Sequence, residues 1–280
     1  MRPILSRKIG IDLGASNVRL YVKGEGIVVN EPSRGQRAVT LHELIGKAQP
    51  RPRLFKPDVA LSVRSAVTLG ERCAVTEEAI AAGARQVWLI DEALAAAMGA
   101  GLPIADRRAS AICEIGAATT EIAVISMSGT VVAQSLPAGG DQLDRAISRA
   151  LAIDEKSAEE AKIAVGSAVP LEKPLVVTLG GREISSNDVA AAIAEPLQAL
   201  VAALREVFEQ TPRRMLADVR ERGLVLSGGG AQLRGLDRHL AHHTGVGVRV
   251  AAEPQTSVVR GTGLALENFE VLRRNQSYTR

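Results

Sequence analysis

A short acidic sequence occurs twice in this chain, 102 residues apart, and this repetition restricts the possible folds severely. The first copy reads Ile9-Gly-Ile-Asp12-Leu-Gly14-Ala-Ser-Asn17, and the second reads Ile112-Cys-Glu114-Ile-Gly116-Ala-Ala-Thr-Thr120. After each copy come an apolar segment, a turn with glycine and a second apolar segment, at 18–22 and 27–29 and again at 121–125 and 131–133. The repeat therefore predicts two similarly built lobes, each with a strand, a tight acidic loop, a strand, a turn and a strand.

The residue types in the two loops suit a bound phosphate chain. Small residues after each glycine allow backbone amides to approach an anion closely, and successive amides in a turn form a phosphate-binding nest. The carboxylates of Asp12 and Glu114 repel phosphate, so their natural partner is a hydrated Mg²⁺ that bridges it. Either copy alone is more simply an ordinary glycine turn. Together the two copies predict a clamp for a triphosphate.

A third glycine-rich segment adds to this prediction. An apolar strand begins at Leu224 and runs into Gly228, Gly229 and Gly230, and a helical pattern follows as far as His243. A glycine-rich turn between a strand and a helix presents free amides, as nucleotide sites require. The chain has neither a GxxxxGK[ST] motif nor a GxGxxG motif that opens a helix, which argues against a P-loop ATPase.

Length and composition set further limits. With 280 residues the chain can support two modest domains, and its 46% apolar but only 2% aromatic residues predict cores of aliphatic side chains. The 34 basic and 31 acidic residues are interspersed, which gives little support to nucleic-acid binding. The two cysteines follow no secretory signal, which favours the cytoplasm. The apolar run at 93–105 is too short to cross a bilayer, and the basic ends are interpreted as solvated tails, with peripheral membrane contact left open.

The order and spacing of these segments resemble the MreB/Mbl branch of the actin and Hsp70 ATPase superfamily. The similar segments include "KGEGIVVNEPS", "LIDEALAAAMGAGLP", "EIGAATTEIAVIS" and "RGLVLSGGGAQLRGLDR". They lie at 9–33, 89–103, 114–126, 138–147, 158–172, 222–238 and 261–268. The resemblance implies an α/β, actin-like (ribonuclease H-like) two-lobed fold with mixed sheets flanked by helices. Lobe I would hold 1–107 plus 256–280, and lobe II would hold 108–255.

Site roles follow from the same resemblance. ATP would bind in the cleft between the lobes, with Mg²⁺ held through water by Asp12 and Glu114. Glu92 matches the residue that orients the attacking water, and Thr119 and Thr120 are weaker catalytic candidates. The residues implied to bind the nucleotide are Asp12, Gly14, Ala15, Ser16, Asn17, Gly116, Ala117, Ala118, Thr119, Glu159, Glu160, Lys162, Gly228, Gly229, Gly230, Ala231 and Gln232.

The chain departs from the family pattern in three places. Glu114 stands where the family has Asp, which disturbs a metal geometry that tolerates little error. Ala117 and Ala118 replace glycines, at a cost of roughly 1 to 2 kcal/mol if either needs a left-handed backbone. Between Ser33 and Lys56 a short connection replaces the small subdomain of lobe I, so that subdomain is largely missing and filament contacts should be weakened.

The resemblance implies a cytoskeletal protein that binds ATP and assembles into filaments supporting cell shape and cell-wall synthesis. At most it would be a slow ATPase coupled to assembly, in the cytoplasm or at the inner face of the membrane. Its implied partners are other copies of itself, a full-length MreB-like relative and the cell-wall synthesis machinery, with no nucleic acid. One alternative is a degenerate nucleotide-binding scaffold that assembles with such a relative, and another is a small-molecule kinase or phosphohydrolase of the same superfamily.

Three other features are better explained by structure than by chemistry. The three histidines at 239, 242 and 243 have helical spacing but lack a nearby carboxylate or cysteine to complete a zinc site, so a solvated helix face is favoured. Ser227 has no recognisable His and acid partner for a hydrolase. An Ala- and Leu-rich helix at 187–208, interrupted by Pro196, is predicted to serve in packing.

Overall fold

Two five-stranded sheets form the framework of the protein in the computed structural model, which describes residues 6–33, 40–48, 56–127 and 129–267. The first sheet has the order β3-β2-β1-β4-β5. Its strands are β1 (Lys8–Leu13), β2 (Asn17–Val22), β3 (Gly26–Pro32), β4 (Asp58–Val63) and β5 (Gln86–Asp91). β1 pairs antiparallel with β2 and parallel with β4, so the sheet is mixed.

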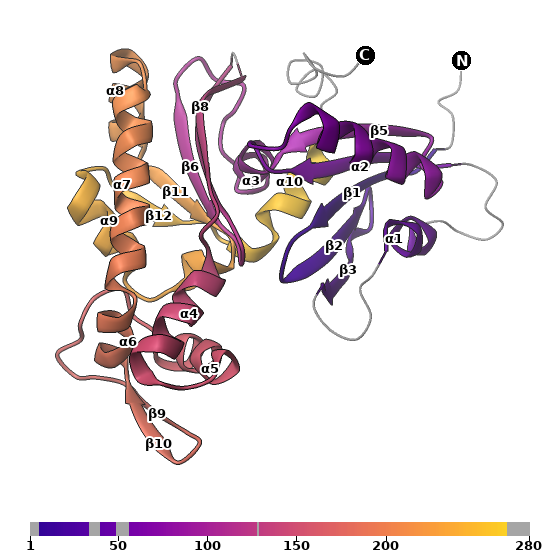
Figure 1. The fold of residues 1–280 in the computed structure, drawn as a ribbon. Coiled ribbons are helices and arrows are strands. Elements are labelled where there is room, and N and C mark those ends of the chain that lie inside the picture. The colour runs from indigo at the N-terminus through magenta and orange to yellow at the C-terminus, as the bar shows by residue number, and fades with distance from the viewer. Residues whose placement is uncertain (1–5, 34–39, 49–55, 128, 268–280) are drawn as a thin grey trace.

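The second sheet repeats this plan with the order β12-β11-β6-β7-β8. Its strands are β6 (Ser110–Ile115), β7 (Thr120–Ser126), β8 (Gly129–Leu136), β11 (Leu224–Ser227) and β12 (Val248–Val250). A separate hairpin of β9 (Val176–Leu179) and β10 (Arg182–Ser185) lies with helices α5 (Glu155–Val165) and α6 (Ser186–Ala192) at the end of the molecule away from the first sheet (Figure 1). The predicted mixed sheets flanked by helices are confirmed.

The sequence repeat is reproduced in the strand register. Leu13 lies opposite Val18 in the first sheet, and Ile115 lies opposite Thr120 in the second, so both acidic turns close at the same point. One pair further from each turn, Asp12 faces Arg19 and Glu114 faces Glu121. The predicted pattern of strand, acidic loop and strand is therefore confirmed in both halves.

Helices cover both sheets, and apolar side chains fill three layers. Around the first sheet lie α1 (Leu41–Lys47), α2 (Leu69–Ala81), α3 (Glu92–Gly99) and α10 (Ser257–Ala265). Around the second lie α4 (Gly140–Leu151), α5 (Glu155–Val165), α6 (Ser186–Ala192), α7 (Ala194–Gln210), α8 (Arg213–Arg222), α9 (Leu236–Thr244) and the short 3-10 turns at Gly229–Gln232 and Pro254–Thr256. Two of the three apolar clusters cover the outer faces of the sheets, and the third lies between the sheets around α3 and α10.

The contact between α3 and α10 depends on two glycines. A Cβ atom on Gly261 would lie 1.7 Å from the carbonyl oxygen of Ala95, and one on Gly99 would lie 1.8 Å from that of Ser257. Only hydrogen fits at these two positions, so the helix backbones approach unusually closely. Because α10 also packs on β1 and α3 on β6, this helix pair connects the two sheets (Figure 1).

The helix expected at 187–208 is two helices, and the break does not fall at Pro196. α6 ends at Ala192 and α7 begins at Ala194, so Pro196 lies in the first turn of α7. Proline is tolerated there because the first amides of a helix have no partner within it, whereas a continuous helix would place its ring against the carbonyl of residue 192. The helix therefore breaks before the proline.

The described residues test other sequence predictions only in part. Most of the connection between Ser33 and Lys56 lies outside the described residues, which include there only 40–48 with helix α1. The lobe boundaries stay a prediction. Among the described residues, no helix has the length and apolar character needed to span a membrane.

Candidate functional site

The two acidic turns have closely similar local geometry. A Cβ on Gly14 would lie 2.8 Å from the backbone oxygen of Asn17, and one on Gly116 would lie 3.1 Å from that of Thr119. In the second turn the amide of Gly116 donates a hydrogen bond of 2.9 Å to this Thr119 oxygen. Each turn thus needs glycine at the same place for its chain to fold back so tightly.

The second turn is held by the start of α4. The amides of Gly140 and Asp141 donate hydrogen bonds of 2.9 Å to the carbonyls of Gly116 and Ala117. Within the described part of the chain, the amides of Ala117 and Ala118 donate to no protein acceptor. The turn therefore has free amides, as an anion-binding nest requires.

The alanines of the second turn are not strained. Among the described residues, Ala152 is the one residue other than glycine with a positive φ, so Ala117 and Ala118 both have ordinary backbone angles. The cost expected for replacing glycine with alanine in a left-handed conformation does not arise here.

Carboxyl groups from three separate elements come together in one cluster. Asp12 and Glu114 are the last-but-one residues of β1 and β6 and are buried, and Glu92 is the first residue of α3. Burial, together with the negative charges of Glu92 and Asp12, raises the pKa of Glu114 well above its usual value. Burial and the charges of Asp12 and Glu121 raise the pKa of Glu92 to about 8. These mutual effects show that the two acidic turns and Glu92 lie close enough for their charges to interact, and that acidic neighbours outweigh basic ones around Glu92 and Glu114.

Asp12 has a cationic neighbour that the sequence analysis did not identify. Nη1 of Arg19 lies 3.2 Å from Oδ2 of Asp12, and the Ser62 hydroxyl lies 3.4 Å from Oδ1. Burial raises the pKa of Asp12, and its ion pair with Arg19 and the hydrogen bonds from Ser62 and Gly14 oppose that rise. The cross-strand register of β1 and β2 brings Arg19 to this place.

Glu121 was also missed, although its sequence context contained a signal. It is fully buried in β7, where it accepts a hydrogen bond of 3.1 Å from the amide of Ser65 and another from the hydroxyl of Ser135. Ser65 follows β4, so this carboxylate joins the two sheets. A charged residue within the apolar run from 120 to 126 could have indicated a buried polar contact.

The glycine-rich segment lies directly against the second acidic turn. Gly228 has a φ of 83°, and a Cβ there would lie 2.5 Å from Oε1 of Glu114 and 2.2 Å from the carbonyl oxygen of Ile115. A Cβ on Gly230 would meet the side chain of Ile115, whereas one on Gly229 would extend into open space. The third predicted segment is therefore adjacent to the second turn, and Ala231 behind it is buried.

Helix α5 reaches the same region from the other side. Glu159 and Glu160 are exposed on this helix, while Nζ of Lys162 lies 2.6 Å from Asp144 and 3.2 Å from the carbonyl of Gly140. Just beyond α5, the amide of Ala168 donates to the carbonyl of Arg234. The two segments expected to contact adenosine are thus neighbours, although Lys162 is engaged in an ion pair.

The remaining candidates differ in accessibility. Ala15 and Ser16 are exposed at the first turn, and the side-chain Nδ2 of Asn17 donates to the side-chain oxygen of Asn30 at 3.1 Å. Gln232 is exposed at the end of the glycine-rich segment, and Thr119 is partly buried in the second turn. Thr120 is buried, and its hydroxyl donates a hydrogen bond of 2.6 Å to the carbonyl of Ala138. Thr120 therefore faces the interior of the second half.

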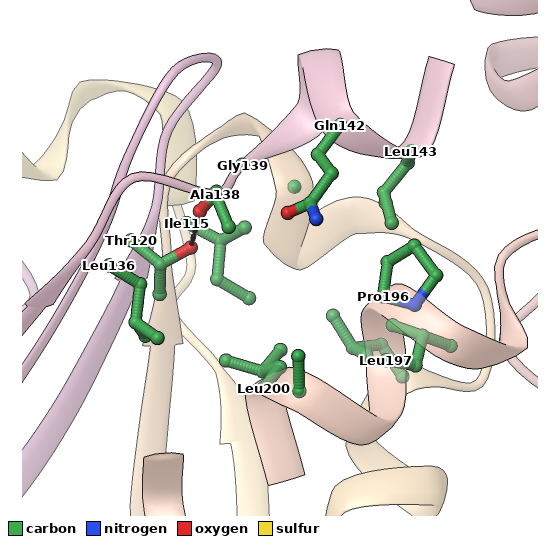
Figure 2. A pocket seen from close by; sticks show the side chains of 13 residues that line it. Ile115, Thr120, Leu136, Ala138, Gly139, Gln142, Leu143, Pro196, Leu197 and Leu200 are labelled. Carbon is green, nitrogen blue, oxygen red and sulfur yellow. Dashed lines mark hydrogen bonds between the residues drawn. The ribbon is translucent and has the colours of Figure 1, made fainter. Parts of the chain in front are cut away.

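A cavity of about 40 Å³ lies beside Thr120 (Figure 2). Its walls come from the second sheet, α4 and α7, and include Leu136, Leu143, Leu197 and Leu200. Ligand pockets usually measure roughly 300 to 1,000 Å³, so this cavity is far too small for a nucleotide. It is distinct from the carboxyl cluster.

The arrangement can be compared with known proteins. Cell shape-determining protein MreB of Escherichia coli (strain K12) is 37% identical over an alignment that covers 96% of this chain and 96% of the relative. Cell shape-determining protein Mbl of Bacillus subtilis (strain 168) is 32% identical, with 96% and 98% covered. The alignment with the first of these has 333 positions, more than the 280 residues of this chain, so part of that relative has no counterpart here.

Solved structures agree with these sequence comparisons. The crystal structure of MreB5 of Spiroplasma citri bound to ADP superimposes with a TM-score of 0.87 at 25% identity, covering 98% of this chain and 99% of that one. The MamK double helical filament shares the fold with a TM-score of 0.77 at 15% identity, covering 94% and 99%. The predicted actin-like fold is thereby confirmed. A family model described as "MreB/Mbl protein" matches residues 35–274, and the chain therefore belongs to the MreB/Mbl family.

Proposed function

We propose that this protein is an MreB-like cytoskeletal protein that binds ATP between its two lobes and assembles into filaments supporting cell shape and cell-wall synthesis. The observation that carries this proposal is the cluster in which the charges of Asp12 and Glu92 act on Glu114, with Gly228 packed against it. Relatives named cell shape-determining proteins support the cellular role. We place lobe I at 1–107 plus 256–280 and lobe II at 108–255, in the cytoplasm.

The nucleotide is assigned to the space around this cluster. The phosphates would contact the amides after Gly14 and Gly116, at Ala15, Ser16 and Asn17 and at Ala117, Ala118 and Thr119. The adenosine would lie between Glu159, Glu160 and Lys162 on α5 and the segment 229–232. Crystal structures of MreB5 bound to AMPPNP and to ADP support nucleotide binding in this fold.

Mg²⁺ would accompany the nucleotide. The carboxylate oxygens of Asp12 and Glu114 are the donor type that Mg²⁺ prefers, and a bound cation would offset the burial and the acidic neighbours that raise the pKa of Glu114. The residue types therefore fit the metal. The described residues contain no group of three acidic, His or Cys side chains that could hold a metal ion, so the phosphates would complete its coordination. Bound there, the metal would neutralise phosphate charge.

Glu92 would orient water for slow hydrolysis. Its pKa of about 8 means that the carboxyl group is mostly protonated at neutral pH in the absence of a bound cation, which makes it a poor proton acceptor. Nucleotide turnover would be slow, and the nucleotide state would act by favouring one lobe arrangement over another and thereby subunit association. Loss of the small subdomain would weaken assembly of the protein on its own, and partners such as a full-length relative or membrane contact would strengthen it.

A pair of glycine variants tests the nucleotide site. Gly229→Leu and Gly247→Leu both place a side chain in open space without a positive φ, so both should keep wild-type thermal stability. Only Gly229 belongs to the segment assigned to adenosine. Titration with a fluorescent ATP analogue and Mg²⁺ should show about a tenfold or greater loss of affinity for Gly229→Leu, and wild-type affinity for Gly247→Leu. Equal affinities in the two variants would refute the assigned site.

Sedimentation with ATP, with ADP and without nucleotide tests assembly. We expect the wild type to pellet with ATP, and Gly229→Leu to lose this response. Equal pelleting with and without nucleotide would instead favour a degenerate scaffold. This is the second candidate because Glu114 stands in place of Asp and because Asp12 already forms an ion pair. Phosphate transfer to an added small acceptor would favour a kinase and contradict the proposal.

A further inference from the structure

The two equivalent positions opposite the acidic residues carry opposite charges. Asp12 faces Arg19 across β1 and β2, and Glu114 faces Glu121 across β6 and β7. Glu121 reaches toward the first sheet and bonds to Ser65. The first acidic turn thus has its own cation from the neighbouring strand, whereas the second has none in that position.

The guanidinium of Arg19 lies within the cluster. Its side chain is 14% exposed, Nη1 lies 3.2 Å from Asp12, and its positive charge offsets a part of the rise that burial and acidic neighbours cause in the pKa of Glu114. Its Nε is buried without a hydrogen-bond partner among the described residues. The contact with Asp12 is a single hydrogen bond, so the group keeps unused donor capacity.

With these properties the guanidinium of Arg19 could perform part of the role of a divalent cation in the site. A metal in this site would neutralise the carboxylates and attract phosphate oxygens, and a guanidinium can do both, because it is always charged and presents donors in a planar fork that suits phosphate. A bound metal would also have to share Asp12 with Arg19, so this carboxylate would bind the metal more weakly.

We propose that Arg19 is a built-in cation that substitutes in part for Mg²⁺, so that nucleotide binding to this chain depends only weakly on the metal. The proposal rests on the nucleotide site proposed above. It predicts that the nucleotide-free protein has little affinity for Mg²⁺, since Arg19 already neutralises Asp12.

Nucleotide titrations of the wild type, Arg19→Gln and Arg19→Lys in excess Mg²⁺ and in excess EDTA test the first part. The wild type should lose no more than about threefold in affinity for a fluorescent ATP analogue when Mg²⁺ is removed. When Mg²⁺ is removed, Arg19→Gln should lose about tenfold or more in affinity for the analogue, because neither the metal nor the guanidinium then forms a charged contact with the phosphates. Arg19→Lys keeps a positive charge and should resemble the wild type. A wild-type affinity that collapses in EDTA overturns the proposal, even if Arg19→Gln fails to fold.

Thermal unfolding with Mg²⁺ alone tests the second part and does not require nucleotide binding. Mg²⁺ should leave the melting temperature of the nucleotide-free wild type unchanged and should raise that of Arg19→Gln, where Asp12 and Glu114 lack the guanidinium. An equal rise in both overturns the proposal. If the wild type binds no ATP at all in Mg²⁺, the proposed nucleotide function fails, while this metal comparison still decides whether Arg19 acts as the resident cation.

Discussion

Replacing Gly261 with alanine is expected to lower the free energy of unfolding by about 3 kcal/mol or more, since overpacking between rigid elements is among the most costly substitutions. The added Cβ would lie 1.7 Å from the carbonyl oxygen of Ala95, so α10 would have to move away from α3. These two helices connect the sheets, and α3 begins with Glu92. The displacement should therefore also change how Glu92 is positioned relative to Asp12.

Gly70→Ala is the matched control for this effect. Gly70 lies in the first turn of α2, and a Cβ there would meet nothing closer than 4.0 Å. We expect this variant to be as stable as the wild type or slightly more stable, because alanine favours the helix. Chemical denaturation of the two variants measures the difference. A Gly261→Ala protein within about 0.5 kcal/mol of the wild type would show that the helices are not as closely packed as described.

The Glu92→Gln variant is expected to be more stable than the wild type at neutral pH, by about 3 kcal/mol as an order of magnitude. The pKa of Glu92 is about 8 in the folded protein against 4.5 for an unperturbed glutamate. Between these values the folded chain holds a proton that the unfolded chain has released, so wild-type stability falls as pH rises from about 4.5 to about 8. Glutamine removes the titration and hence this loss.

Denaturation curves at several pH values between 4.5 and 8.5 measure this difference. The stability gained by Glu92→Gln should be near zero at the acidic end, grow with pH and level off above about pH 8. Glu77 is an exposed residue on α2, and Glu77→Gln is the control. The stability of this variant relative to the wild type should not grow with pH in this way. A gain that is independent of pH would mean that Glu92 is not held protonated by burial and by its acidic neighbours.

The parts of the site that depend on local sequence could be predicted. The acidic turns follow from strand alternation and a glycine that each turn requires, both of which are visible in the residues around Asp12 and Glu114. The glycine-rich turn at Gly228 could be recognised from the apolar strand before it, and the resemblance to the family assigned it to the same site. In each case the information lies within about ten residues of the chain.

The features that depend on tertiary contacts could not be predicted. The ion pair of Arg19 with Asp12 depends on which residues face each other across β1 and β2, and a shift of one residue would have turned Arg19 to the other face. The buried contact of Glu121 with Ser65 requires knowing how the two sheets approach. The second turn is held by hydrogen bonds from Gly140 and Asp141 to the carbonyls of Gly116 and Ala117, which the sequence of the turn alone does not reveal.

A crystal structure with AMPPNP and Mg²⁺ would show directly where the nucleotide binds. We expect the triphosphate to lie between the turn at 14–17 and the turn at 116–119, with the adenine between α5 and residues 229–232. Density for the nucleotide at any other place, or phosphates that contact only one of the two turns, would contradict it.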